Sequence, residues 1–116
     1  MIEEFRRARR RKVSDTVLVT DAMTDGVIGR IGNVSETGML LMASAPLVED
    51  ALYQFRFRLL AANGREIPME VGAHLLWLDR ASAPGQAWTG LRFIAIPPDQ
   101  AEQLRDWIDA PCSHYE

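Results

Sequence analysis

The clearest hydrophobic pattern in the chain is a strict alternation between residues 50 and 60. Apolar and polar side chains follow one another there at every second position: Tyr53, Phe55, Phe57 and Leu59 alternate with Gln54, Arg56 and Arg58. Successive side chains of a β-strand point to opposite faces. The alternation therefore predicts a strand with one buried face and one solvent-exposed face.

Five other segments are also predicted as strands, because β-branched and apolar residues dominate them and turn residues bound them: 13–20, 27–32, 39–42, 67–78 and 87–96. Asp25-Gly26 and Asn63-Gly64 supply hairpin signals. At Asn63-Gly64 we expect a type I′ turn, whose two central residues both need positive φ. The apolar run from Leu75 to Leu78 suits a strand covered on both faces.

A single helix is predicted after the last strand, which Pro97-Pro98 ends because proline lacks the N–H of a strand ladder. Asp99 precedes Glu102 by three positions and predicts a capping box. Apolar side chains follow at helical spacing: Ala101, Leu104, Trp107 and Ile108. The helix should end near Ala110-Pro111. The fold class is thus mainly β, a six-stranded antiparallel barrel with one C-terminal helix.

Composition places this chain among folded soluble proteins. It has 116 residues, of which 47% are hydrophobic and 25% are charged, as is ordinary for one domain. No apolar run approaches the roughly 20 residues that cross a bilayer, and no apolar segment of a secretory signal follows the basic start. The single cysteine, Cys112, fits a reducing compartment. We expect a cytoplasmic protein without membrane insertion.

Charge is distributed unevenly along the chain. Residues 1–12 contain six basic and two acidic side chains, whereas the whole chain has a net charge of −3. A basic segment joined to an acidic body suggests an anionic partner, but it also fits a tail that docks on its own acidic body. Both interpretations stay open. We predict a flexible basic arm at 1–12, a barrel with its helix at 13–110 and a loose tail at 111–116.

The chain offers little for catalysis or for a metal site. Its two histidines, His74 and His114, together with Cys112 do not supply the four ligands of a structural zinc site. Glycine-rich phosphate loops are absent from the sequence. We therefore predict a protein that is not an enzyme and that carries neither a metal nor a cofactor.

The arginines of the arm are the side chains best suited to binding a nucleotide. Guanidinium groups make bidentate hydrogen bonds to phosphate and stack on base faces. Arg7 and Arg11 are four positions apart, and so are Arg6 and Arg10. Either pair can reach a ligand from two sides. Such arms also bind nucleic acid or are simply solvated, so the signal is weak alone.

A second polar stretch, "NVSETG" at residues 33–38, interrupts the strand pattern. Asn33 and Ser35 have short polar side chains that stabilise turns by bonding nearby backbone. Gly38 permits a backbone conformation closed to other residues, or a close approach by a ligand. Taken alone, this stretch is better interpreted as a structural turn.

Together the two stretches resemble the PilZ domain family, whose members are receptors for the bacterial second messenger cyclic di-GMP. The family pattern is RxxxR before the first barrel strand and [D/N]xSxxG after the second. Here the matching residues are Arg7 to Arg11 and Asn33 to Gly38. The stretch "TGLRFIAIPPDQAEQLRDWI" is similar to the last strand and closing helix of the family. The resemblance spans nearly the whole chain.

The resemblance implies a role for each motif residue. Arg7 and Arg11 would hold the guanine and phosphate of the ligand, with Arg6 and Arg10 as the alternative pair because Lys12 separates Arg11 from the apolar start of the strand. In the second motif, Asn33 and Ser35 would face the guanine edge. Gly38 would let the chain turn without blocking the site.

From the resemblance we expect a stand-alone cyclic di-GMP receptor that orders its arm on the ligand and acts on an unidentified downstream protein. In this family an arginine directly before the motif tends to accompany two intercalated ligands. With the Arg7–Arg11 pair that residue is Arg6, so an intercalated dimer is expected. Two alternatives remain: a PilZ-like interaction module that does not bind the nucleotide, and a small β-barrel that binds nucleic acid. The acidic body and the lack of paired aromatic side chains on one strand, of the kind that stack bases, argue against nucleic-acid binding.

Overall fold

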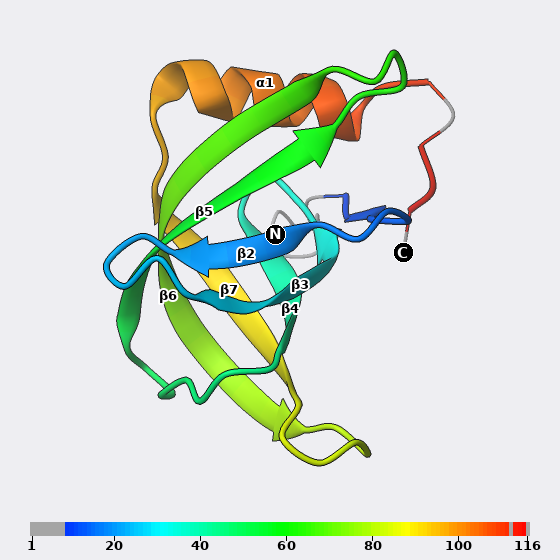
Figure 1. Ribbon diagram of the computed structural model, residues 1–116. Coiled ribbons are helices and arrows are strands. Elements are labelled where there is room, and N and C mark those ends of the chain that lie inside the picture. The colour runs from blue at the N-terminus through cyan, green and yellow to red at the C-terminus, as the bar shows by residue number, and fades with distance from the viewer. Residues whose placement is uncertain (1–8, 112, 116) are drawn as a thin grey trace, which may run out of the picture.

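The computed structural model describes residues 9–111 and 113–115. The elements in chain order are β1 (Arg11–Lys12), β2 (Leu18–Asp21), β3 (Val27–Val34), β4 (Gly38–Ala43), β5 (Leu52–Leu60), β6 (Glu66–Arg80), β7 (Ala87–Ala95) and α1 (Pro98–Ile108). Strands β2 to β7 form a closed antiparallel barrel in the order β3–β2–β5–β6–β7–β4, and β4 pairs with β3 to complete the ring (Figure 1). The predicted six-stranded barrel with one helix is confirmed.

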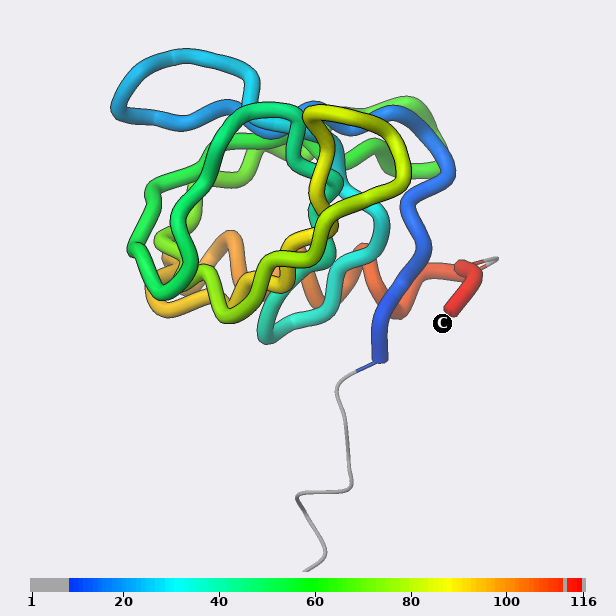
Figure 2. The backbone as a smooth tube through the Cα atoms, turned by 90° about the horizontal axis from the view of Figure 1, so that it is seen from below, coloured from blue at the N-terminus to red at the C-terminus, as the bar shows by residue number. Residues whose placement is uncertain are grey.

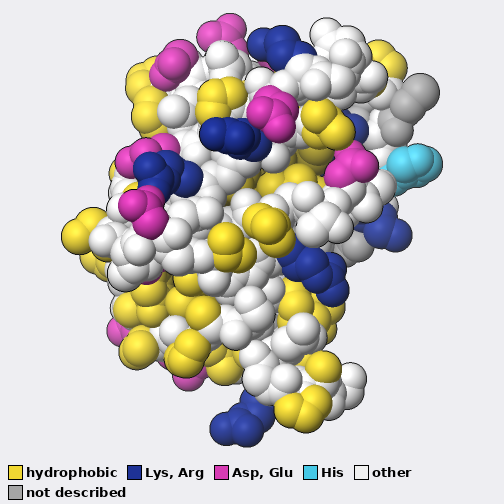
Figure 3. Space-filling view, viewed as in Figure 1, with side chains coloured by type: hydrophobic (Ala, Val, Ile, Leu, Met, Phe, Trp, Pro, Cys, Tyr) yellow, Lys and Arg dark blue, Asp and Glu magenta, His cyan; other side chains and the backbone are white. Residues whose placement is uncertain are grey.

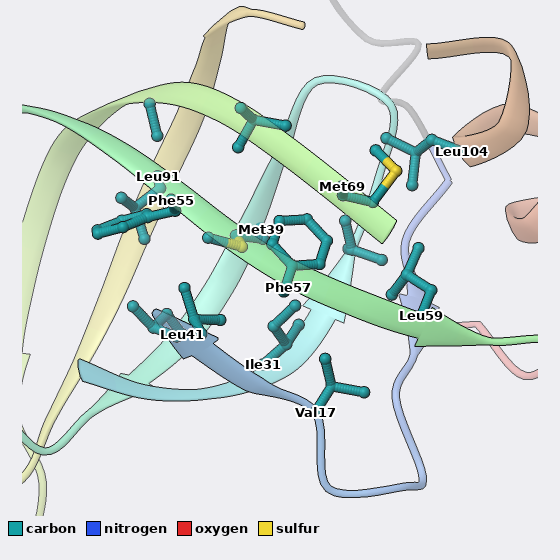
Figure 4. Packing of buried hydrophobic residues seen from close by; sticks show 14 of the residues in the cluster. Val17, Ile31, Met39, Leu41, Phe55, Phe57, Leu59, Met69, Leu91 and Leu104 are labelled. Atoms are coloured by element: carbon teal, nitrogen blue, oxygen red, sulfur yellow. The ribbon is translucent and has the colours of Figure 1, made fainter. Parts of the chain in front are cut away.

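The alternation in β5 divides its residues between the core and the solvent. Phe55, Phe57 and Leu59 are at most 4% exposed, whereas Arg56 and Arg58 lie outside. Side chains from the other strands complete the core around them, among them Ile31, Met39, Leu41, Met69 and Leu91 (Figure 4). Burial of these apolar surfaces is the main force that closes the barrel.

Helix α1 lies across one end of the barrel (Figures 1 and 2). Its buried face consists of Leu104, Trp107 and Ile108, and the Trp107 Nε1–H donates to the Leu60 carbonyl of β5 at 3.0 Å. The helix therefore covers an end at which apolar side chains would otherwise meet water. Within the described residues no helix is both long and apolar enough to cross a membrane.

The predicted capping box is wrong. The N-cap residue is Pro97, no side chain caps the helix, and Asp99 lies inside the first turn. Proline at the first helical position already has the φ of a helix and lacks an N–H that would need a partner. Pro98 therefore starts the helix earlier than the Asp99–Glu102 spacing suggests.

Two local predictions in the β5–β6–β7 region are also wrong. Gly64 has a φ of +86°, but Asn63 does not have positive φ, so the turn is not type I′. Instead, the Gly64 N–H closes a turn onto the Ala61 carbonyl at 2.9 Å, as in three-residue hairpin loops. The apolar run in β6 is not covered on both faces, because a bulge between Leu75 and Trp77 leaves the Trp77 side chain outside.

The first strand and the end of the chain lie together. The sequence predicts an arm up to residue 12, and the structure has Arg11 and Lys12 as β1, paired with the edge of β3 outside the barrel. Tyr115, in the predicted tail, forms an isolated bridge with Arg11. The flexibility of the arm and the division of the chain into three parts stay predictions.

Candidate functional site

The pairing of β1 with β3 joins the two sequence motifs. Lys12 lies opposite Asn33, and Arg11 lies opposite Val34. The Arg10 Nη1–H donates to the Asn33 Oδ1 at 3.0 Å, and the Asn33 side chain is only 4% exposed. Residues more than twenty positions apart thus form one polar cluster on the outside of the barrel.

Neighbouring arginines of the arm have partners on different sides. Arg10 contacts Asn33 of β3, whereas Arg9 and Arg11 contact the C-terminal end of α1. Such a division follows from extended backbone, where successive side chains point in opposite directions. The arm therefore uses alternate guanidinium groups for two different surfaces.

Arg11 is stacked on the helix. Its guanidinium carbon lies 3.8 Å from the centroid of the Trp107 ring, and Nη1 donates to the Trp107 carbonyl at 2.5 Å. Burial lowers the pKa of the Arg11 guanidinium, and the negative charges that Tyr115 and Asp15 can carry partly oppose this shift. The side chain stays a cation at physiological pH, because arginine does not deprotonate in proteins.

Arg9 makes the second contact with the helix end. It forms an ion pair with Asp109, and its guanidinium carbon lies 4.8 Å from the centroid of the Tyr115 ring. Both side chains of the ion pair are more than half exposed, so its strength is modest. The sequence analysis missed Asp109 and Tyr115 as partners of the arm, and identified Trp107 only as part of an apolar stripe.

Ser35 organises the turn between β3 and β4. Its side chain is 1% exposed, and its Oγ accepts the Thr37 N–H at 3.1 Å and the Gly38 N–H at 3.2 Å. The Ser35 N–H in turn donates to the Gly38 carbonyl at 2.8 Å. The contacts of Ser35 are those of a turn residue.

Gly38 is required by close packing between two strands. A Cβ at this position would lie 2.2 Å from the Leu91 carbonyl oxygen of β7. The adjacent Thr37 carbonyl accepts the Phe93 N–H of β7 at 2.8 Å. The second motif therefore fixes β4 against β7 as well as forming part of the candidate site.

The structure brings Arg10, Asn33, Ser35 and Gly38 to one side of the barrel, and turns Arg11 towards α1. Arg6 and Arg7, the first arginines of the two possible pairs, lie outside the described residues. Within those described, no group of three or more His, Cys, Asp or Glu side chains has the arrangement of a metal site.

The chain is thus a small antiparallel barrel with a basic arm on the outside of β3 and a helix that closes one end. The family model of the PilZ domain matches residues 4–110. The chain therefore belongs to the PilZ domain family, whose members are ligand-binding modules, and no catalytic family is indicated. A comparison with curated proteins found no match.

Solved structures with a similar fold include the inhibitor of motility MotI (DgrA) of Bacillus subtilis, with a TM-score of 0.71 and 14% identity over 90% of this chain. For YcgR of Escherichia coli in complex with c-di-GMP, the TM-score is 0.69 and the identity is 20% over 90% of this chain. For the PilZ domain of YcgR with c-di-GMP, the TM-score is 0.62 and the identity is 17% over 87% of this chain, which covers 86% of that domain. The chain spans only 49% of MotI and 44% of the longer YcgR chain. At these identities the likeness concerns the fold.

We predict that Ser35→Ala lowers stability. The buried Gly38 N–H and the partly buried Thr37 N–H would lose their acceptor, which costs about 1–3 kcal/mol. Thermal unfolding should show a lower melting temperature than the wild type, whereas Ser82→Ala, at an exposed loop position, should leave it unchanged. A variant with wild-type stability that no longer binds a ligand would instead show Ser35 acting on the ligand alone.

Gly38→Ala should destabilise the barrel, because the added methyl group meets the Leu91 carbonyl. Overpacking of this kind typically costs about 1–3 kcal/mol. Denaturant unfolding of Gly38→Ala can be compared with Gly26→Ala, where the nearest atom to the new Cβ is 3.4 Å away. Equal stability of the two variants would contradict the packing explanation.

Proposed function

We propose that this chain is a cyclic di-GMP receptor without catalytic activity of its own. The hydrogen bond between Arg10 and Asn33 carries the proposal, because it joins the two motifs that the family uses for the nucleotide. A dianion with two guanines needs guanidinium groups for its phosphates and polar groups for its base edges. Arg10, Asn33 and the neighbouring backbone offer both within one cluster.

The same hydrogen bond supports Arg6 and Arg10 as the RxxxR pair. In this register the second arginine of the pair contacts the first residue of the other motif. In the Arg7–Arg11 register the second arginine is stacked on Trp107 instead. The ligand would then be bound by Arg6 as well as by Arg10.

A binding event of this kind has to be passed to another molecule through a surface. We propose that the nucleotide fixes the segment that carries Arg6, and that this segment and the nucleotide together form a surface for a downstream protein. Binding of nucleic acid has less support. On the face seen in Figure 3, basic and acidic side chains are interspersed and do not form one extended basic surface, whereas binding to a polyanion needs positive charge gathered along a track.

The decisive experiment is a calorimetric titration with cyclic di-GMP, with GTP and a short single-stranded RNA as controls. We expect binding of cyclic di-GMP alone, and Arg10→Ala should weaken it about ten- to a hundredfold, since a charge-assisted contact contributes about 1.5–3 kcal/mol. Arg58→Ala, on the exposed face of β5, is the matched control. Wild-type affinity of Arg10→Ala would exclude the Arg6–Arg10 register, and no binding by the wild type would exclude the receptor.

The number of ligands per chain separates the two registers. In the Arg7–Arg11 register, the residue before the pair is Arg6, and an arginine there would accompany an intercalated ligand dimer. In the Arg6–Arg10 register, the residue before the pair is the bulky apolar Phe5. In this family such a residue tends to accompany a single ligand. With Arg6 and Arg10 as the pair we therefore expect close to one ligand per chain by calorimetry, and Phe5→Arg should raise the value towards two. A wild-type value of two would favour Arg7–Arg11 and the dimer.

A further inference from the structure

The end of α1 is completed by groups from outside the helix. The last carbonyls of a helix have no partner within it. Here residues of the arm and tail donate to two of them and to a third carbonyl just beyond the helix. The pairs are Arg11 to the Trp107 carbonyl at 2.5 Å, the Tyr115 hydroxyl to the Ile108 carbonyl at 2.7 Å, and the Ser113 hydroxyl to the Ala110 carbonyl at 2.6 Å. Arm, tail and helix end therefore form one bonded unit.

The backbone of the arm is held on both of its edges. On one edge, Arg11 and Lys12 pair with Val34 and Asn33 of β3. On the other, the Lys12 N–H donates to the His114 carbonyl at 2.8 Å, and Arg11 bridges to Tyr115. A two-residue strand on its own is weak, so the tail supplies the second half of its backbone contacts.

The side chains on the helix side also set the direction of Arg10. With Arg9 on Asp109 and Tyr115, and Arg11 on Trp107, the alternation of an extended chain leaves Arg10 directed away from the helix. That is where it meets Asn33. A rotation of the arm that moved Arg10 out of the cluster would therefore also break the contacts of Arg9 and Arg11.

We propose that Asp109 and Tyr115 are positioning residues, which hold the arm so that Arg10 lies on Asn33 before the nucleotide arrives. This inference rests on the proposed function and deepens it, because it assigns to the C-terminal end of the chain a role in the nucleotide site. A ligand pays less conformational entropy when its site is already ordered. The apparent dissociation constant rises in proportion as the fraction of molecules with a competent arm falls.

The test uses the full chain, with cyclic di-GMP as the probe. Asp109→Asn with Tyr115→Ala removes the ion pair and the ring contact of Arg9, together with the hydrogen bond from the Tyr115 hydroxyl to the Ile108 carbonyl, and leaves Arg10 and Asn33 intact. We expect binding about three- to twentyfold weaker, from one exposed ion pair and one cation–π contact. Asp106→Asn, which removes the same charge from the same helix but leaves the Arg9–Asp109 ion pair, should bind like the wild type. Asp109→Glu with Tyr115→Phe should restore most of the affinity.

A second measurement separates positioning from a general loss of stability. In the free wild-type protein, the heteronuclear NOE values of the Arg10 and Lys12 amides should match those of β3. In the double variant they should fall while those of the barrel strands stay unchanged, and calorimetry should show the loss as a less favourable binding entropy.

Three results would overturn the inference. The first is an unchanged affinity of the double variant, and the second is low NOE values of the arm amides in the free wild type. The third is tighter binding by the double variant, which would show that the helix end competes with the nucleotide for the arginines. A wild type that binds no cyclic di-GMP would overturn the proposed function, whereas rigid arm amides that depend on Asp109 and Tyr115 would still establish the contact itself.

Discussion

The pairing of Arg11 and Lys12 with the last residues of β3 is the constraint on which the candidate site depends. The barrel is closed by β2 to β7 without this strand, so its core does not require β1. The contribution of β1 is to fix the position of the arm on the barrel. It brings an arginine-rich segment to the point where β3 ends and the Ser35 turn begins, and so converts two separate polar stretches into one cluster.

The second motif serves the fold before it serves any ligand. Ser35 satisfies two backbone N–H groups of the turn, and Gly38 allows β4 to approach β7 more closely than any side chain would permit. Asn33 differs from them, since its side-chain oxygen already accepts a hydrogen bond from the arm. A turn of this kind can offer fixed donors and acceptors to the edge of a base, because its own hydrogen bonds do not have to rearrange.

The barrel could be predicted from the sequence because its information is local. Alternation along β5 and the turn residues between strands determine which faces are buried. The start of α1 was mispredicted where two local signals compete, since a proline at the first helical position outweighs the Asp99–Glu102 spacing. The contacts of Arg9 with Asp109 and of Arg11 with Trp107 join residues about a hundred positions apart. Nothing in the spacing of either segment indicates the other.

The sequence left two interpretations of the basic arm, an anionic partner or its own acidic body. The geometry of an extended chain makes them compatible. Arg9 and Arg11 are occupied by a carboxylate, two aromatic rings and a carbonyl of the same molecule, while Arg10, between them, is directed to Asn33. The guanidinium groups that are bound to the barrel and helix restrict the conformations of the arm. This restriction gives the intervening Arg10 a defined position. A run of consecutive arginines can thus be an anchor and a binding element at once, because the pleat of the backbone separates the two roles at every second residue.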